Sequence, residues 1–347
     1  MVIINTLLFN LTMDPSQISI PPLKNLTTDN ITENVHLINT HNNPSPRLSY
    51  ILERLVTHLH DFARETRLST EEWMAGIQFL TKTGQTCTDV RQEFILLSDI
   101  LGLSLLVDSM DHPKPTELGA TEGTVLGPFH TLEAEHKEAG AQISHDPDGE
   151  PLLVICTVKD LKGKPIEGIK IDIWETDSTG HYDVQRPEVN HGKPDNRAIM
   201  TSDKDGKFWF QGITPVSYPI PHDGPVGQLL LKLRRHPWRP AHVHFKFSGD
   251  GWDELITALY VRGDPYETTD AVFGVKDGLV VDIKEVTDES MAQEYGVKVG
   301  FKLLTHDFVL VTSEESAQLR EKRARSALEK LGRRVKFLDG LPVPDVD

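Results

Sequence analysis

The chain has 347 residues, and its 36 basic against 52 acidic residues give a formal net charge of −16. This balance excludes a protein built to bind nucleic acid, because a phosphate backbone requires a basic surface. The two cysteines, Cys87 and Cys156, are too few and too far apart for a disulfide framework, so we expect a cytoplasmic protein. Any metal site must then use nitrogen and oxygen ligands. No apolar run approaches the roughly 20 residues of a transmembrane helix, and no membrane partner is expected.

In the N-terminal third of the chain, the composition and the hydrophobic pattern change at Arg47. Residues 1–46 are rich in Asn, Thr, Pro and Ser without a sustained hydrophobic period, which predicts a flexible N-terminal arm. Apolar residues then recur every three or four positions, from Leu48 to Phe62, and predict an amphipathic helix over 47–65.

Two capping-box signatures follow this helix. Ser69 with Glu72 predicts the start of a second helix, and Asp89 with Gln92 predicts the start of a third that continues through Leu101. We therefore expect a helical domain over residues 47–115.

Beyond about residue 125 the apolar period changes from 3.6 to 2. The segment I-K-I-D-I-W at 169–174 alternates in this way, and Asp205-Gly206 is a typical hairpin turn. Further short apolar runs predict strands at 152–158, 207–213, 229–234, 241–247, 255–261, 279–283 and 307–312. Many short strands predict a β-sandwich domain over 116–313. A charged helix at 314–331 begins a C-terminal segment that covers 314–347.

The segment W-R-P-A-H-V-H-F-K-F, at 238–247, places His242 and His244 two residues apart on a predicted strand. Side chains at i and i+2 of a strand point to the same face, as two ligands of one metal ion must. The alternative is a pair of partly buried histidines that bond backbone groups. These residues alone leave both interpretations open.

Two tyrosines in the same predicted domain stand in unusual settings. Tyr182 follows a glycine in a turn after the strand that ends at Trp174, and Tyr218 lies in a proline-fixed stretch before the histidines. Taken singly, each is more typical of a packing residue. Two phenols together with two imidazoles narrow the choice of metal ion, because a phenol with a pKa of roughly 10 rarely binds Zn(II) or Mg(II). Fe(III) deprotonates its ligands, so the set points to non-haem Fe(III) rather than to a two-His-one-carboxylate Fe(II) site.

The order G-x-Y at 180–182, Y-P-I-P at 218–221 and R-P-A-H-x-H at 239–244 resembles the intradiol ring-cleavage dioxygenases, and the resemblance runs from about residue 47 to 312. It is similar to the catechol and hydroxyquinol branch. The resemblance implies a mainly β fold, with a β-sandwich catalytic domain and an N-terminal α-helical dimerisation segment. It also implies one Fe(III) per subunit, with Tyr182, Tyr218, His242 and His244 as metal ligands.

The resemblance also implies roles in the reaction with a small aromatic diol or triol and O2. Tyr218 would leave the iron and accept a proton from the substrate. Arg239 would stabilise negative charge on the activated ring, which suits a guanidinium that stays protonated.

For the substrate pocket the stretches T-E-G-T-V-L-G-P-F-H and D-A-V-F-G-V-K-D are more similar to the hydroxyquinol enzymes. The expected activity is hydroxyquinol to maleylacetate, and the alternative is a catechol 1,2-dioxygenase that gives cis,cis-muconate. Asp99 would accept a hydrogen bond from a third ring hydroxyl, or is an ordinary polar helix residue. Ala258 stands where catechol enzymes have a glutamine, which weakens the catechol alternative. The expected substrate-binding residues are Leu96, Asp99, Val125, Leu126, Gly127, Pro128, Phe129, Ile220, Pro221 and Val272.

The family resemblance further implies a homodimer through the N-terminal helices, with a phospholipid in an apolar tunnel. The sequence equally allows a monomer with these helices packed inward. Two other functions are alternatives to a dioxygenase. One is a zinc-binding β-sandwich module in which both tyrosines are dispensable, and the other is a non-catalytic relative that keeps the fold.

Overall fold

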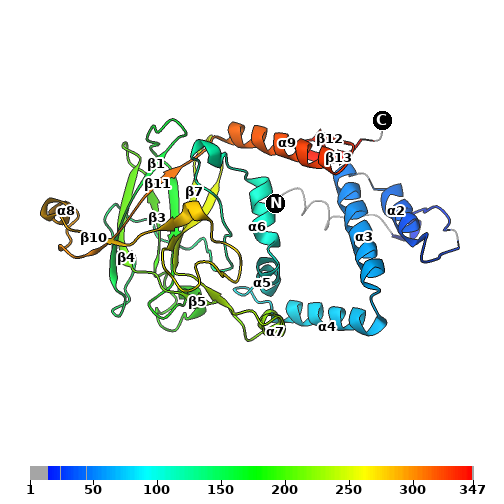
Figure 1. Ribbon diagram of the computed structural model, residues 1–347, viewed down its shortest axis with the longest axis horizontal. Coiled ribbons are helices and arrows are strands. Elements are labelled where there is room, and N and C mark those ends of the chain that lie inside the picture. Colours follow the sequence, from blue (N-terminus) through cyan, green and yellow to red (C-terminus); the bar gives the residue numbers. More distant parts are fainter. Residues whose placement is uncertain (1–14, 24, 44, 346–347) are drawn as a thin grey trace. The chain divides into compact units, whose positions relative to one another are not determined.

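The computed structural model describes residues 15–23, 25–43 and 45–345 (Figure 1). The chain divides into two compact units, residues 1–75 with 326–347 and residues 76–325. The predicted limits of the arm, helical domain, sandwich and C-terminal segment remain predictions. Among the described residues, no helix combines the length and the apolar character needed to cross a membrane.

The first unit consists of helices and one hairpin. Its helices are the 3-10 turn Pro15–Gln17, α2 (Ile31–His41), α3 (Pro46–Thr66) and the start of α4 (Thr70–Thr86), and its hairpin pairs β12 (Val335–Leu338) with β13 (Leu341–Pro344). The capping box before α4 is confirmed, because Ser69 N donates to Glu72 at 2.9 Å and Glu72 N donates to Ser69 at 3.2 Å. Arg47 connects α3 to the hairpin by donating to the carbonyl of Pro342 at 2.7 Å.

Within the predicted N-terminal arm, Ile31–His41 is helical, and part of the remainder of the arm lies outside the described residues. The flexibility of the arm remains a prediction. Two expectations for the residues that follow were wrong. The predicted third helix is two helices, α5 (Glu93–Ile100) and α6 (Leu103–Asp111), because Gly102 takes a left-handed φ of 73° between them. Asp89 and Gln92 form no capping box; the Thr88 hydroxyl accepts instead from Arg91 N at 3.0 Å.

The second unit contains the predicted β-sandwich, so the fold-class prediction is confirmed (Figure 1). One sheet has the order β10-β11-β1-β4 and the other has the order β3-β2-β7-β8-β9. The strands are β1 (Pro151–Lys159), β2 (Lys170–Trp174), β3 (Arg197–Thr201), β4 (Lys207–Ile213), β7 (His242–Ser248), β8 (Leu255–Val261), β9 (Val280–Val281), β10 (Lys284–Glu285) and β11 (Lys302–Val309).

Short elements complete this unit. A two-stranded ladder joins β5 (Tyr218–Pro219) to β6 (Trp238–Arg239). Besides α5, α6 and the rest of α4, the unit contains α7 (Pro225–Lys232), α8 (Glu289–Glu294) and 3-10 turns at Thr116–Leu118, Asp183–Gln185 and Asp277–Leu279. Helix α9 (Ser313–Lys330) confirms the predicted charged helix, and its last five residues belong to the first unit.

Three strand predictions need correction. Residues 229–234 fall mostly in α7, because the run follows Pro225 at a helix start rather than alternating in and out. The last long strand is Lys302–Val309, which begins five residues before the predicted 307–312. Asp205-Gly206 does form a turn, but β3 and β4 pair in different sheets. The turn therefore crosses between the two layers instead of closing a hairpin.

The core of the sandwich lies between the inner faces of the two sheets. Phe208 of β4 and Phe308 of β11 face Phe245 and Phe247 of β7, and the Phe308 ring centroid is 4.5 Å from that of Phe247. Because β7 also carries the two histidines, this aromatic packing fixes the strand that presents them.

Replacing Phe308 by Ala should lower the free energy of unfolding by about 3–5 kcal/mol, because the variant leaves a cavity among the aromatic rings. Chemical denaturation monitored by circular dichroism measures the change. Leu132→Ala, at a side chain that is 86% exposed, is the control and should change it by less than about 0.5 kcal/mol. Equal losses in the two variants would contradict this description of the core.

Candidate functional site

Strand β7 presents both histidines to one buried site. His242 and His244 are two residues apart on the strand and are almost fully buried. The register pairs His244 with Trp174 of β2 on one side and with Ala258 of β8 on the other. The Trp174 indole stacks on the His244 imidazole with ring centroids 4.7 Å apart and planes within 5°. The residue directly opposite His244 on β8 is therefore a small apolar one.

The β5–β6 ladder positions Tyr218 together with Arg239. Tyr218 and Arg239 are direct partners in this antiparallel ladder. The pairing places the two side chains next to each other, and Arg239 donates to the Tyr218 hydroxyl at 3.4 Å.

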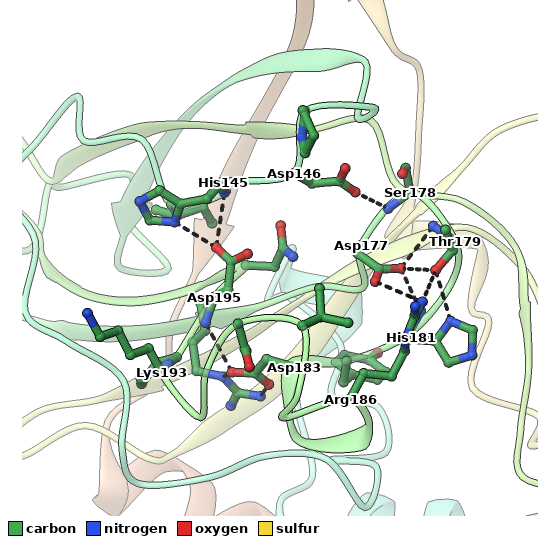
Figure 2. Close-up of a pocket in the computed structure, with 18 of the residues that line it drawn as sticks. His145, Asp146, Asp177, Ser178, Thr179, His181, Asp183, Arg186, Lys193 and Asp195 are labelled. Carbon is green, nitrogen blue, oxygen red and sulfur yellow. Dashed lines mark hydrogen bonds and ion pairs between the residues drawn. The ribbon is translucent and has the colours of Figure 1, made fainter.

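Tyr182 comes from a loop that is fixed by acidic side chains (Figure 2). Asp177 accepts hydrogen bonds from the hydroxyl of Thr179 at 2.7 Å and the backbone N–H of His181 at 3.0 Å. The next residue after Tyr182, Asp183, forms a buried ion pair with Arg197. These residues and Tyr182 line a cavity of about 690 Å³. Neither His242 nor His244 lines this cavity. The cavity therefore lies on the outer side of Tyr182, and its charged residues hold the Tyr182 loop.

The two phenols and two imidazoles converge at one point. The hydroxyl oxygens of Tyr182 and Tyr218 are 3.1 Å apart, and the Nε2 atoms of His242 and His244 are 3.0 Å apart. Arg239 Nη1 lies 3.2 Å from the Nε2 of His242 and so joins the phenol pair to the imidazole pair.

Burial sets the protonation of these groups. The pKa of His242 falls to about 3, because burial and the Arg239 charge both disfavour a second cation. Burial and the His242 ring likewise lower the pKa of His244. Since the Pro240 carbonyl can only accept, His242 Nδ1 donates to it at 2.7 Å and its Nε2 keeps a lone pair. Burial and Tyr218 raise the pKa of Tyr182 well above its ordinary value, so the protein alone keeps this phenol neutral.

This donor set fits a strongly Lewis-acidic metal ion. Two ligands of one ion with bonds of roughly 2 Å lie about 3 Å apart, which is the spacing of both pairs. Neutral imidazoles offer lone pairs, whereas the phenols would need a strong cation to ionise. Among the described residues no group of three or more His, Cys, Asp or Glu forms a metal site, so a metal at this point would require the tyrosine oxygens.

Two residues that the sequence analysis missed hold Arg239. Asp270 accepts from Arg239 Nε at 3.2 Å and from Nη2 at 3.3 Å, and the Tyr260 hydroxyl lies 3.1 Å from Nη2. Side chains alternate along β8, so Tyr260 lies on the same face as Ala258, and this alternation could have placed Tyr260 near the site. Nothing in the sequence around Asp270 indicates its partner.

The predicted substrate residues form two apolar groups. Leu96, Val125, Ile220 and Val272 belong to one buried cluster, and Phe129 with Leu126 packs against the two tyrosines. Phe129 stacks on Tyr182 with centroids 4.9 Å apart.

The remaining predicted substrate residues lie close by. A Cβ on Gly127 would be 3.8 Å from His244 Nε2, so this backbone borders the histidines. Phe129, Ile220 and Pro221 line a groove of about 640 Å³. Pro128 follows Gly127 directly and is partly buried.

Asp99 is buried on α5, and burial raises the pKa of its carboxyl. The charges of Arg239 and Asp270 also act on this pKa, so Asp99 lies within electrostatic range of them.

Comparison with known families agrees with this geometry. The family model described as "Dioxygenase" matches residues 125–311, and the model described as "Catechol dioxygenase N terminus" matches residues 45–119. The chain is 66% identical over 335 residues to the intradiol ring-cleavage dioxygenase hqdA of Aspergillus niger, covering 96% of this chain and 100% of the relative. The chain belongs to the intradiol ring-cleavage dioxygenases. It is therefore an oxidoreductase that uses dioxygen.

Other relatives of this intradiol dioxygenase carry more specific names. A hydroxyquinol 1,2-dioxygenase of Rhizobium sp. is 46% identical and covers 76% of this chain and 89% of the relative. A solved hydroxyquinol 1,2-dioxygenase from Pseudomonas putida DLL-E4 superposes with a TM-score of 0.74 at 41% identity, over 82% of this chain and 99% of that one. A catechol 1,2-dioxygenase of Candida albicans is 35% identical and covers 80% of this chain and 91% of the relative.

Asp183→Asn should lower the free energy of unfolding by about 3–5 kcal/mol, because it leaves the Arg197 guanidinium buried without its counter-charge. Asp307→Asn removes the exposed partner of Lys159 and is the control; it should cost less than about 1 kcal/mol. Urea denaturation of the two variants measures both changes. A small loss in Asp183→Asn would mean that the Tyr182 loop is held by other contacts.

Proposed function

We propose that this intradiol dioxygenase is a non-haem Fe(III) enzyme that converts hydroxyquinol (1,2,4-trihydroxybenzene) to maleylacetate in the catabolism of aromatic compounds. One ferric ion per chain would be held by Tyr182, Tyr218, His242 and His244. The observation that carries the proposal is the meeting of two phenol oxygens and two neutral imidazole nitrogens beside a buried guanidinium. We further propose a cytoplasmic location, which the free thiols of Cys87 and Cys156 support.

The residues of the site have separate tasks in this proposal. When bound, the ferric ion supplies the Lewis acidity that ionises the phenols and the substrate hydroxyls and prepares the ring for dioxygen. The Tyr218 oxygen accepts a substrate proton, and its hydrogen bond from Arg239 is already in place. Arg239 stabilises negative charge on the ring, because a guanidinium does not give up its proton.

The apolar walls keep water from the reacting ring. Leu96, Val125, Ile220 and Val272 are each at most 3% exposed, and they come from four different segments of the second unit. Water that reached the site would weaken the interaction between Arg239 and the developing charge.

The choice of hydroxyquinol over catechol rests on two residues and on the relatives. Asp99 is a buried carboxyl near Arg239, with its pKa raised by burial, and it would hydrogen-bond a third ring hydroxyl. Ala258 lies opposite His244 on β8, where catechol enzymes have the larger glutamine. The hydroxyquinol dioxygenases of Rhizobium sp. and Rhodococcus opacus are 46% and 44% identical. The alternative, a catechol 1,2-dioxygenase forming cis,cis-muconate, is supported by the Candida albicans relative.

Purified protein loaded with iron should be wine-red, because tyrosinate absorbs visible light when bound to Fe(III), and its spectrum should shift on substrate addition. It should consume oxygen faster with hydroxyquinol than with catechol. Asp99→Ala should reduce this preference by roughly ten-fold, the effect of losing about 1.4 kcal/mol of hydrogen bonding. Oxygen-electrode rates and the visible spectrum are the measurements.

The controls separate the parts of this proposal. Removal of iron by a chelator should abolish colour and oxygen uptake, and re-addition should restore both. Faster turnover of catechol would keep the iron site and refute the substrate assignment. A colourless protein that stays inert after iron loading would refute the dioxygenase mechanism and favour a structural zinc site at the two histidines.

We also propose a homodimer formed through the N-terminal helices, with a phospholipid acyl chain against the same apolar surface. One face of α3 carries Ile51, Leu55, Leu59 and Phe62 at steps of three and four residues, and each is between 44% and 55% exposed. A continuous exposed apolar face on a helix is typical of an association surface.

The double variant Leu55→Glu/Leu59→Glu should halve the mass measured by light scattering after gel filtration, because two buried charges per chain would oppose association. Leu132→Glu, at a leucine of the second unit that is 86% exposed, is the control and should leave the mass unchanged. A wild-type protein that already runs as a monomer would refute the dimer. Mass spectrometry of an organic extract of the wild-type protein tests for the phospholipid.

A further inference from the structure

Asp270 occupies a position that none of the catalytic roles above accounts for. Its side chain is about 2% exposed, and that of Arg239 is about 3% exposed. Although burial alone would raise the pKa of Asp270, the neighbouring Arg239 charge holds it below its ordinary value. The carboxylate is therefore an ionised group in a dry site, and all of its partners lie in the protein.

Each oxygen of this carboxylate bonds two different parts of the site. Oδ1 accepts from Arg239 Nε at 3.2 Å and from the backbone N–H of Val272 at 3.3 Å. Oδ2 accepts from Arg239 Nη2 at 3.3 Å and from the backbone N–H of Gly274 at 2.9 Å. The same two atoms thus hold the guanidinium and the loop that carries the Val272 wall.

The loop is pressed closely against this network. A Cβ on Gly274 would lie 2.6 Å from the Tyr260 hydroxyl and 2.9 Å from Arg239 Nη2. The carbonyl of Gly274 accepts from the Thr124 hydroxyl at 2.7 Å. There is consequently no room for the loop and the guanidinium to shift independently.

We propose that Asp270 is a positioning residue that sets the place of the Arg239 guanidinium and the place of the Val272 wall with one carboxylate. The proposal rests on the function proposed above. It assigns Asp270 two separable effects, one on the chemical step through Arg239 and one on substrate fit through the loop. A displacement of about 1 Å at a catalytic group can cost roughly 100-fold in rate.

The test is a double-variant cycle on iron-loaded protein with Arg239→Gln, Asp270→Asn and both together. Asp270→Asn should lower kcat by roughly 10- to 100-fold, and this loss should shrink to less than about two-fold in the Arg239→Gln background, because a residue that acts through Arg239 has nothing left to position. The anaerobic affinity for hydroxyquinol, followed by the visible spectrum, should fall in both backgrounds because the loop contacts do not depend on Arg239. If Asp270→Asn lowered kcat by the same factor in the wild-type and in the Arg239→Gln background, the proposal would be overturned.

A second readout does not depend on activity. Hydrogen–deuterium exchange of the peptide that covers residues 270–276 should accelerate in Asp270→Asn, because two backbone N–H groups lose their acceptor. Asp253→Asn is the matched control. It breaks a partly buried ion pair with Lys114, and should leave kcat and exchange of the 270–276 peptide unchanged. Unchanged exchange in Asp270→Asn would overturn the role in the loop.

Gly274→Ala covers the case in which Asp270→Asn does not fold. Its added methyl group pushes the loop away from Arg239 while every charge remains, so the same loss of kcat and the same faster exchange are expected. Normal kcat and normal exchange in a folded Gly274→Ala would overturn the proposal. If wild-type protein consumed no oxygen with either substrate, the proposed function would fail, whereas the exchange results would still decide whether Asp270 holds the loop.

Discussion

The buried positive charge of Arg239 is the constraint on which the rest of the site depends. The guanidinium of a side chain that is 3% exposed needs a counter-charge and hydrogen-bond acceptors inside the protein. Asp270 supplies the charge, and the hydroxyls of Tyr218 and Tyr260 accept further hydrogen bonds. Burial and the same charge together lower the pKa of His242 and keep its ring neutral. The cation proposed to act on the ring therefore also helps His242 to keep a lone pair for a metal ion.

The sandwich core and the site share one strand. The inner residues of β7, Phe245 and Phe247, pack into the aromatic core, whereas His242 and His244 lie on the opposite parity of the same strand. Because side chains alternate strictly along a strand, fixing one face by packing fixes the direction of the other. Hydrophobic packing thus sets the direction of the histidines, His242 is held further by its hydrogen bond to the Pro240 carbonyl, and His244 stacks on the Trp174 ring.

The sequence supported the site better than it supported some of the elements. H-x-H on a strand, two tyrosines in fixed turns and an upstream arginine were local signals, and the structure brings all five side chains together. The helix at 225–232 was misread because short apolar runs fit a helix and a strand almost equally. The break at Gly102 depends on a left-handed backbone conformation, and the strand at 302–309 was predicted as a strand with the wrong limits. The capping box at Ser69 was correct and that at Asp89 was wrong, since capping also depends on whether a nearby hydroxyl competes, as that of Thr88 does.

The sequence by itself determined the chemistry available to this protein: which donors exist, that the two histidines share a face, and that the whole set matches a ring-cleaving dioxygenase. Only the tertiary structure decided which distant residues complete the site. Asp270 meets Arg239 across 31 positions of chain, and Trp174 meets His244 through the register of two strands. Such contacts arise from packing and strand pairing over the whole domain, and a local stretch of sequence carries no record of its partner.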